Sequence, residues 1–314
     1  MKDLIPIQLL DGGLGTTLED KYGVKFSEAT PLWSSHLLVT DQQTLLACQT
    51  DFGNERIDVI TTATYQVSIG AFKATRTPDW TRGVDLPNIP RFLEDAVLIV
   101  NKAAPAAKIA LSLGPYGATM IPSTEYSGRY DDKHDNQWTL YRWHLERLML
   151  YLKNDTGLGF VSYLAFETIP RLDEIKAIRG LLALEPVSKM MPWISCVFPG
   201  DDDKLPDGSS VQEVVHAMLS NEISVFGLWG IGINCTKVSK LDNLVRQFEK
   251  AVQGLIDLNQ LASWPSLVLY PDGTNGEVYD TVTKTWKLPK GLKPPEVGLL
   301  SRWCLSSCLL MQST

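Results

Sequence analysis

Short apolar runs alternate with helical segments along most of the chain. Each run is rich in aliphatic or β-branched residues and is bounded by turn-forming or polar residues, which is the pattern of a buried β-strand. The sequence predicts such strands at residues 5–10, 57–66, 108–117, 161–169, 190–198, 227–235 and 266–270.

Segments in which apolar residues recur at helical spacing separate these strands. The sequence predicts helices at residues 42–52, 91–104, 138–152, 172–184, 210–219 and 242–258. We expect a further short helix after the first strand. The hydroxyl group of Thr16 or Thr17 is suited to capping its first turn.

Apolar strands that alternate with helices indicate a parallel sheet covered on both faces. Polar residues recur where these strands end, and in a (β/α)8 TIM barrel such ends meet at one mouth. We therefore predict an α/β fold of the TIM-barrel type, with a doubly wound open sheet as the alternative. No internal repeat or linker is visible, so residues 1–314 are expected to form a single domain. The polar residues are Asp11, Thr62, Thr64, Glu167 and Cys235.

Composition and charge narrow the classes of function. A chain of 314 residues with a net charge of −7 and no basic patch is not expected to bind nucleic acid. No apolar run approaches the roughly 18 residues that a membrane span needs, and the apolar stretch near residue 5 is too short for a secretory signal. The five cysteines are odd in number and scattered, which favours reduced thiols and a cytoplasmic protein.

Cys235 is the first candidate for chemistry, because it ends the apolar, glycine-punctuated run 227–235. A free cysteine is often only a small buried hydrophobe, and it becomes nucleophilic or metal-binding as a thiolate. The glycines at 12, 13 and 15 match neither a dinucleotide fingerprint nor a P-loop. We interpret the remaining cysteines of the barrel region and the four histidines as packing, structural or solvated residues: Cys48, Cys196, His36, His134, His144 and His216.

Several short motifs, taken together, resemble the homocysteine S-methyltransferase family. They follow the family's order over about residues 8–286, and residues 287–314 diverge from it. The motifs are Leu10-Asp-Gly-Gly-Leu-Gly-Thr16, Pro31-Leu-Trp-Ser34, Thr62-Ala-Thr-Tyr-Gln66, Ser112-Leu-Gly-Pro-Tyr-Gly-Ala118, Glu125-Tyr-Ser-Gly128, Phe166-Glu-Thr168, Ser195-Cys-Val197, Gly232-Ile-Asn-Cys235 and Leu269-Tyr-Pro271.

The resemblance implies a TIM barrel that transfers a methyl group from S-methylmethionine or S-adenosylmethionine to homocysteine, forming methionine. In this family a Zn²⁺ ion is held by the cysteine that matches Cys235, together with two adjacent cysteines that follow strand eight. Zinc coordination deprotonates a thiol and leaves its sulfur nucleophilic. By the same match, Glu167 would accept hydrogen bonds from the ammonium group of homocysteine. Asp11, Gly12 and Thr62 would complete the amino-acid pocket.

The chain departs from the family near its C-terminus. The family's Gly-Gly-Cys-Cys motif is absent, and Cys304 and Cys308 stand four residues apart instead. This spacing places two thiols on one face of a helix, so these residues are candidates for a rebuilt zinc site. The alternative is a barrel that lacks its eighth strand and closing helix and is left open. Such a chain would be a non-catalytic, amino-acid-binding protein without a complete zinc site.

Overall fold

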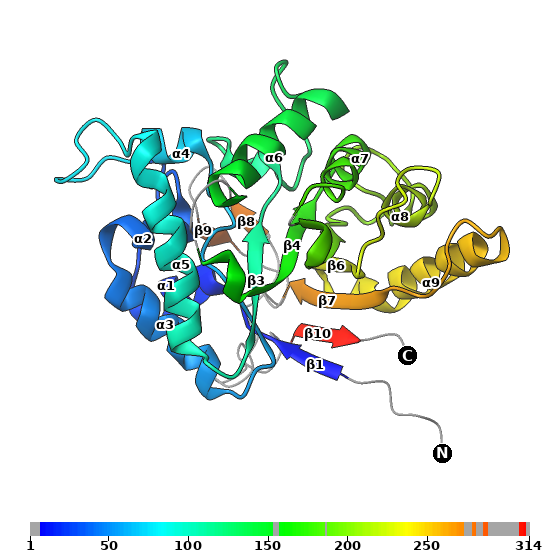
Figure 1. Cartoon of the computed structure of the whole chain (residues 1–314), viewed down its shortest axis with the longest axis horizontal. Helices are drawn as coiled ribbons and strands as arrows, with labels where there is room; N and C mark the ends of the chain where they lie inside the picture. The colour runs from blue at the N-terminus through cyan, green and yellow to red at the C-terminus, as the bar shows by residue number, and fades with distance from the viewer. Residues whose placement is uncertain are drawn as a thin grey trace.

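A closed sheet of eight strands forms the centre of the molecule (Figure 1). The computed structural model describes residues 7–152, 157–185, 187–272, 278–280, 285–287 and 308–311. The strand order around the barrel is β1-β10-β7-β6-β5-β4-β3-β2. Each strand from β1 to β6 pairs in parallel with the next strand in the sequence. The strands are β1 (Ile7–Leu10), β2 (Val59–Thr61), β3 (Lys108–Leu113), β4 (Val161–Ile169), β5 (Met191–Cys196), β6 (Gly230–Lys237), β7 (Ser266–Asp272) and β10 (Cys308–Met311).

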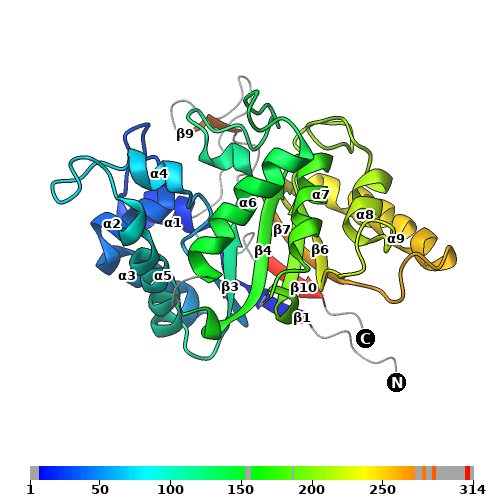
Figure 2. The same ribbon diagram turned by 45° about the horizontal axis from the view of Figure 1, so that its top comes forward.

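Helices connect the parallel strands and lie outside them (Figures 1 and 2), as the alternating sequence pattern predicts. They are α1 (Leu14–Tyr22), α2 (Leu37–Thr40), α3 (Gln42–Asn54), α4 (Ile69–Ala74), α5 (Ile89–Ala103), α6 (Gln137–Leu152), α7 (Leu172–Leu181), α8 (Val211–Leu219) and α9 (Leu241–Asp257). Short 3₁₀ turns add η1 (Trp33–His36), η2 (Leu86–Asn88), η3 (Tyr116–Thr119), η4 (Leu158–Phe160), η5 (Val187–Lys189) and η6 (Val238–Lys240). β8 (Val278–Asp280) and β9 (Thr285–Lys287) form a separate antiparallel pair.

The eighth position of the ring is occupied by β10, which runs antiparallel to both neighbours. One alternative from the sequence was a barrel left open without its eighth strand, whereas the hydrogen-bonded ladder is continuous from β1 through β10 to β7. β1 and β10 lie side by side near the two chain ends in both views (Figures 1 and 2). The reversed direction means that the first residue of β10, Cys308, pairs with the last residue of β1, Leu10.

Two groups of apolar side chains fill the protein. The larger one lies between the sheet and the surrounding helices and accounts for most of the buried apolar residues. The smaller one fills the inside of the barrel, where side chains from alternate positions of the strands meet. Its buried members are Leu10, Val59, Ala110, Tyr163, Ala165, Trp193 and Val268.

The outer face of β1 is partly exposed. Ile7 is 54% exposed and Leu9 is 39% exposed. Among the described residues no helix follows Asp257, so none of them takes the place of the closing helix of a regular barrel. In that part of the chain no helix has the length and apolar character that crossing a bilayer requires.

Three details differ from the sequence prediction. Helix α1 begins at Leu14 behind Gly13, so Thr16 and Thr17 lie inside it and neither caps it. Strand β2 ends at Thr61 instead of residue 66, and strand β3 ends at Leu113 instead of residue 117. Threonine hydroxyls compete with a sheet for backbone hydrogen bonds, which is the physical reason that residues 62–66 turn away instead of extending β2.

The residues interpreted as packing or structural groups are confirmed as such where they are buried. Cys48 and Cys196 are fully buried in the larger apolar core. His144 is fully buried and its Nε2 lies 2.8 Å from Glu174 Oε1.

Candidate active site at the barrel mouth

Asp11 follows β1 directly and is only 5% exposed. Its backbone N–H donates to the carbonyl of Val59, which extends the ladder between β1 and β2 by one bond. Its Oδ2 accepts hydrogen bonds from the backbone N–H of Thr61 at 2.8 Å and from the Thr61 hydroxyl at 2.9 Å. Asp11 therefore joins the carboxyl ends of the first two strands, as its predicted position at the mouth requires.

Gly12 comes next in the chain and lies against an aromatic ring. A Cβ atom at this position would be 3.0 Å from Cε1 of Phe52, which is tighter than ordinary packing allows. A side chain at residue 12 would therefore require the Phe52 ring to move by a few tenths of an ångström. The structure places Gly12 beside the mouth, and its predicted contact with an amino acid stays a prediction.

Thr62 takes part in a buried chain of hydrogen bonds that reaches Glu167. Its hydroxyl lies 2.6 Å from that of Thr64 and accepts from the backbone N–H of Ser112 at 3.1 Å. The Thr64 hydroxyl donates to the carbonyl of Ser112 at 2.8 Å. The Ser112 hydroxyl in turn donates to Oε1 of Glu167. The ends of β2, β3 and β4 are thus connected through side chains.

Glu167 extends the row of β4 residues that face the inside of the barrel, two positions after Ala165. It is 8% exposed, and burial raises its pKa to about 7 despite hydrogen bonds from Ser112 and Tyr270. The hydroxyl of Tyr270, on β7, also hydrogen-bonds Ser195 and accepts from Nε1 of Trp193 at 3.3 Å. Hydroxyl groups from two sides therefore hold this carboxyl group in place.

Cys235 points into the mouth because the backbone at the end of β6 is irregular. Its φ of 47° lies in the left-handed region that residues with a side chain seldom adopt, and the register with β7 shifts between Asn234 and Lys237. Thr168 at the end of β4 has a φ of 60° and lies in a similar register break. Such bulges at barrel rims redirect side chains.

The side chain of Asn234 connects these two strand ends. Its Oδ1 accepts from the backbone N–H of Thr168 at 2.9 Å, and its Nδ2 donates to the Thr168 hydroxyl oxygen at 2.7 Å. The same Nδ2 lies 3.3 Å from Sγ of Cys235, and the Thr168 hydroxyl lies 3.8 Å from it. Cys235 and Glu167 are therefore held in one rigid arrangement across β4 and β6.

Burial raises the pKa of the Cys235 thiol to about 11, although hydrogen bonds from Tyr126 and Thr168 oppose the rise. The thiol is accordingly protonated near pH 7 unless a cation lies beside it. Among the described residues no group of three or more histidine, cysteine or carboxylate side chains is close enough to hold a metal ion. Cys235 is the metal-ligand candidate that this part of the chain supplies.

The two other candidate ligands stand differently. Cys304 lies outside the described residues. Cys308 is the first residue of a strand, so the prediction that it shares a helix face with Cys304 is wrong. Its pairing with Leu10 places its backbone at the same rim of the sheet as Asp11.

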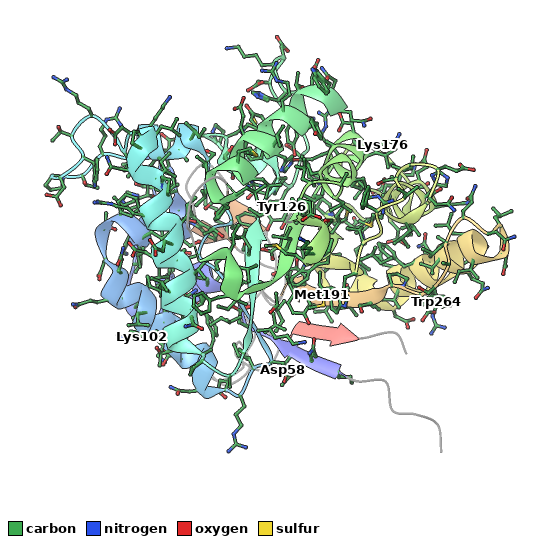
Figure 3. The ribbon with its side chains drawn as sticks, viewed as in Figure 1. Asp58, Lys102, Tyr126, Lys176, Met191 and Trp264 are labelled. Carbon is green, nitrogen blue, oxygen red and sulfur yellow. The ribbon has the colours of Figure 1, made fainter. Side chains whose placement is uncertain are left out.

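Three further residues, Tyr65, Glu125 and Tyr126, belong to the site, although sequence reasoning gave them no role. Tyr126 hydrogen-bonds the thiol of Cys235, and Tyr65 hydrogen-bonds Thr168. Burial and the neighbouring charge of Glu125 raise the pKa of Tyr65 well above its usual range. Figure 3 draws Tyr126 above Met191, the first residue of β5, in line with a position over the carboxyl ends of the strands. All three residues lie in quoted motifs, which is the signal that could have identified them.

The fold and the mouth residues define a TIM-barrel protein whose site combines buried carboxyl groups with a thiol. A family model described as homocysteine S-methyltransferase matches residues 8–301. The chain therefore belongs to the homocysteine S-methyltransferase family, and it is a methyltransferase enzyme. Membership implies homocysteine and a methyl donor as substrates.

Individual relatives agree with this assignment. The homocysteine S-methyltransferase of Escherichia coli K12 is 31% identical over 284 residues, which are 89% of this chain and 81% of the relative. Homocysteine S-methyltransferase 1 of Brassica oleracea var. italica is 29% identical, and the match covers 88% of this chain and 79% of the relative. The crystal structure of the E. coli homocysteine methyltransferase MmuM in its metallated form matches with a TM-score of 0.62 and 28% sequence identity. The match covers 84% of this chain and 83% of the MmuM chain.

Proposed function

We propose that this enzyme transfers a methyl group from a sulfonium donor to the sulfur of homocysteine, with Zn²⁺ as the metal that activates the thiol. One observation carries the proposal: the carboxyl group of Glu167 and the thiol of Cys235 lie at one barrel mouth, joined through Asn234 and Thr168. An amino acid whose side chain ends in a thiol has its two reactive ends matched by these groups. The family assignment supports the same substrate.

Glu167 is assigned to the ammonium group of homocysteine. A carboxyl group with a pKa of about 7 is kept partly neutral by burial, and an ammonium group beside it restores the ionised form. Asp11 is assigned to the same pocket with Gly12 and Thr62, because its carboxyl group is buried at the mouth and near enough to Glu167 for the charge of that residue to raise its pKa. The hydroxyl network from Thr62 to Glu167 keeps the acid in place when the substrate is absent.

Cys235 is assigned as one zinc ligand, with Cys308 and Cys304 as the others. Thiolates suit Zn²⁺, and a nearby cation reverses the effect of burial on a thiol pKa. The chemistry of Cys235 fits this role, since its sulfur lies at the mouth and receives hydrogen bonds from the neutral side chains of Thr168 and Asn234. Support for Cys308 comes from its register position opposite Leu10. When bound, zinc lowers the pKa of the homocysteine thiol and keeps the thiolate available.

The chain's own residues would then align the reaction. The homocysteine sulfur forms a bond to the methyl carbon while the bond from that carbon to the donor sulfur breaks, and its electron pair stays on the leaving thioether. The thiol proton is lost to solvent. Tyr126 and Tyr65 lie near Cys235 and would keep water from a homocysteine thiolate bound there. Such a displacement depends mainly on alignment.

A coupled assay tests the proposal. Purified protein is given zinc and homocysteine with either S-methylmethionine or S-adenosylmethionine, and methionine formation is measured together with the zinc-to-protein ratio. We expect methionine with at least one donor. Homocysteine binding without zinc and without methionine would instead identify an amino-acid-binding protein. The free thiols of Cys48, Cys196 and Cys235 are consistent with a cytoplasmic location, which we also propose.

A further inference from the structure

The segment 114–136, which we call the mouth segment, carries two residues to the candidate site from outside the barrel strands. Glu125 is 5% exposed, and Tyr126 hydrogen-bonds the thiol of Cys235. The segment folds back on itself, since the N–H of Thr124 donates to the carbonyl of Gly117 at 2.9 Å and that of Gly128 donates to the carbonyl of Thr124 at 2.8 Å. These two bonds shape the turn but do not fix it to the barrel.

Glu174, on α7, fixes the mouth segment at two points. Its Oε1 accepts from the backbone N–H of Tyr116 at 2.8 Å, and its Oε2 accepts from the hydroxyl of Tyr130. One carboxyl group thus holds positions on both sides of Glu125 and Tyr126. Glu174 is fully buried, so these bonds are shielded from water and a lost partner is costly.

Two residues of helix α6, His144 and Arg147, connect the Glu174 carboxyl group to the start of the mouth segment. His144 lies 2.8 Å from Glu174 Oε1, and its Nδ1 lies 3.1 Å from a guanidinium nitrogen of Arg147. The same nitrogen of Arg147 donates to the carbonyl of Gly114 at 2.8 Å, where the mouth segment begins. Both His144 and Arg147 are buried. The segment is thereby attached to α6 as well as to α7.

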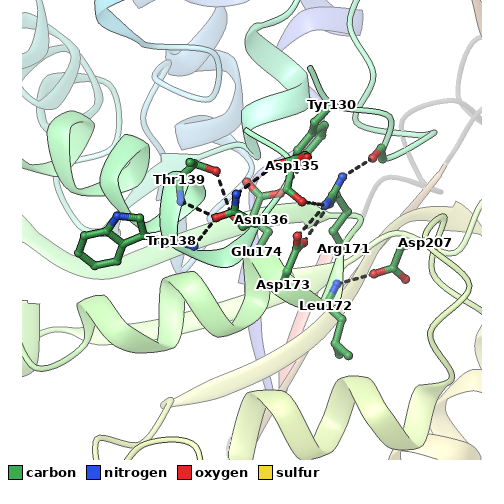
Figure 4. Close-up of polar contacts among 11 residues, drawn as sticks. Tyr130, Asp135, Asn136, Trp138, Thr139, Arg171, Leu172, Asp173, Glu174 and Asp207 are labelled. Carbon is green, nitrogen blue, oxygen red and sulfur yellow. Dashed lines mark hydrogen bonds and ion pairs between the residues drawn. The ribbon is translucent and has the colours of Figure 1, made fainter. Parts of the chain in front are cut away.

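Arg171 provides the third attachment (Figure 4). Its guanidinium group donates to the carbonyl of Gly128 at 3.2 Å and to that of Asp135 at 3.0 Å, and it lies 4.8 Å from the centre of the Tyr130 ring. A two-pronged ion pair with Asp173, at 2.9 and 2.6 Å, fixes its orientation. Arginine suits this role because its planar group donates in several fixed directions at once.

Arg171 and Glu174 both lie in the chain just after β4, the strand that carries Glu167 and Thr168. We propose that Arg171 and Glu174 are positioning residues, which hold the mouth segment so that Tyr126 covers the sulfur of Cys235. They touch no mouth group themselves and act through the backbone and through Tyr130. This inference deepens the proposed function, because Cys235 is the thiol to which that function assigns the metal. The position of β4 then determines the position of the Glu167 carboxyl group and, through Arg171 and Glu174, that of Tyr126.

Alkylation of Cys235 tests the inference on the purified full-length chain. Iodoacetamide modification is followed peptide by peptide, so that Cys235 is separated from Cys48 and Cys196. In the Arg171→Gln variant we expect Cys235 to react several-fold faster while the two core cysteines keep their rates. Arg246→Gln is the control, because Arg246 also makes a two-pronged pair, with Asp242 at the exposed surface of α9, and has no hydrogen bond to the segment.

A second variant separates this local effect from a general change in folding. Tyr130→Phe removes only the hydroxyl group that donates to Glu174, so it should raise the Cys235 rate while Cys48 and Cys196 in the apolar core keep their rates. Amide exchange should quicken at Thr124 and Gly128, whose N–H groups report the folded turn. Arg171→Lys should rescue the effect only in part, since an ammonium group cannot replace the planar fork.

The outcomes separate this inference from the proposed function. Alkylation and exchange rates equal to those of Arg246→Gln in both variants would overturn the positioning role. A rise of the same size at all three cysteines would also overturn it, because it would indicate general loosening. If the parent protein transfers no methyl group, the proposed function fails, whereas faster reaction confined to Cys235 still supports the positioning of the segment.

Discussion

Asp11 and Glu167 carry two buried carboxyl groups at the same barrel mouth, and burial raises the pKa of each to about 7. The negative charge of Glu167 raises the pKa of Asp11 as well. Near neutral pH the free protein therefore holds protons on acids that are ionised in most proteins. A positively charged ligand between them would displace those protons, and this coupling makes the assigned pocket testable.

Amino-acid binding should depend on pH. We expect the affinity for methionine, which has an ammonium group but no thiol, to fall as the pH drops below 7, because protonated Glu167 cannot pair with the ammonium group. Binding at pH 6.5 should release protons, which calorimetry in buffers of different ionisation enthalpy measures. A constant affinity between pH 5.5 and 8 would contradict the assignment.

Glu167→Gln should weaken homocysteine binding more than it disturbs the fold. The amide keeps the volume but loses a charge-assisted hydrogen bond, so we expect a loss of about 1.5–3 kcal/mol in binding free energy. Calorimetry on zinc-loaded protein gives the affinity, and Glu249→Gln on the exposed face of α9 is the control. A folded Glu167→Gln protein with the parent affinity would remove Glu167 from the pocket.

The same substitution should change how stability depends on pH. Folding raises the pKa of Glu167 from its ordinary 4.5 to about 7, so its stabilising contribution is complete below pH 4.5 and is lost as the pH rises to 7. Relative to the parent, Glu167→Gln should gain about 2 kcal/mol of unfolding free energy between pH 5 and 7. Urea unfolding at several pH values measures the difference. A difference that is flat or falls with pH would show that this acid is not buried as described.

Zinc retention should depend on three cysteines if the proposed ligand set is correct. A catalytic zinc site uses three protein ligands, so Cys235→Ser, Cys304→Ser and Cys308→Ser should each abolish zinc retention to a similar degree. Cys48→Ala is the control, since Cys48 lies in the apolar core. Metal analysis of dialysed protein measures the ratio of zinc to protein in each variant. Loss in Cys235→Ser alone would show that the other two thiols are not ligands.

Two glycines inside helices should respond to alanine in opposite ways. At Gly15 in α1 an added Cβ would lie 2.3 Å from the indole of Trp33, so Gly15→Ala should destabilise the protein by about 1–3 kcal/mol. At Gly254 in α9 nothing lies within 4 Å, so Gly254→Ala should stabilise it by about 0.5–1 kcal/mol. Thermal unfolding of both variants tests the contrast. Equal shifts would mean that helix propensity alone decides both sites.

The sequence by itself determined the order of elements and most of the candidate mouth. Apolar strands alternating with amphipathic helices are a local property, and they predict a parallel barrel because each strand must be covered on both faces. Glu167 could be placed at the mouth from the pattern, since it is a polar residue near the end of the apolar run that forms β4. The motifs added Gly12 and the predicted roles of the mouth residues, and the family model confirms the family that they indicate.

Only the tertiary structure decided how Cys235 is directed. Gly232 faces the barrel interior, where an added Cβ would meet Val268 and Ser195, so a regular strand would place Asn234 inside and Cys235 outside. The left-handed φ of Cys235 and the register break remove this alternation. A bulge depends on which partner strand lies alongside, and strand periodicity does not encode it.

Long-range pairing decided the remaining features. The direction of β10, which places Cys308 opposite Leu10 and not at the far rim, depends on contacts between residues about 300 positions apart. Glu174 and Arg171 looked like ordinary residues of a helix start, yet they hold a segment that begins near residue 114. Local sequence fixes which segments become strands and helices, because propensity and periodicity act over a few residues. Which side chains meet at the mouth is set by packing between distant segments, and that is a property of the folded chain alone.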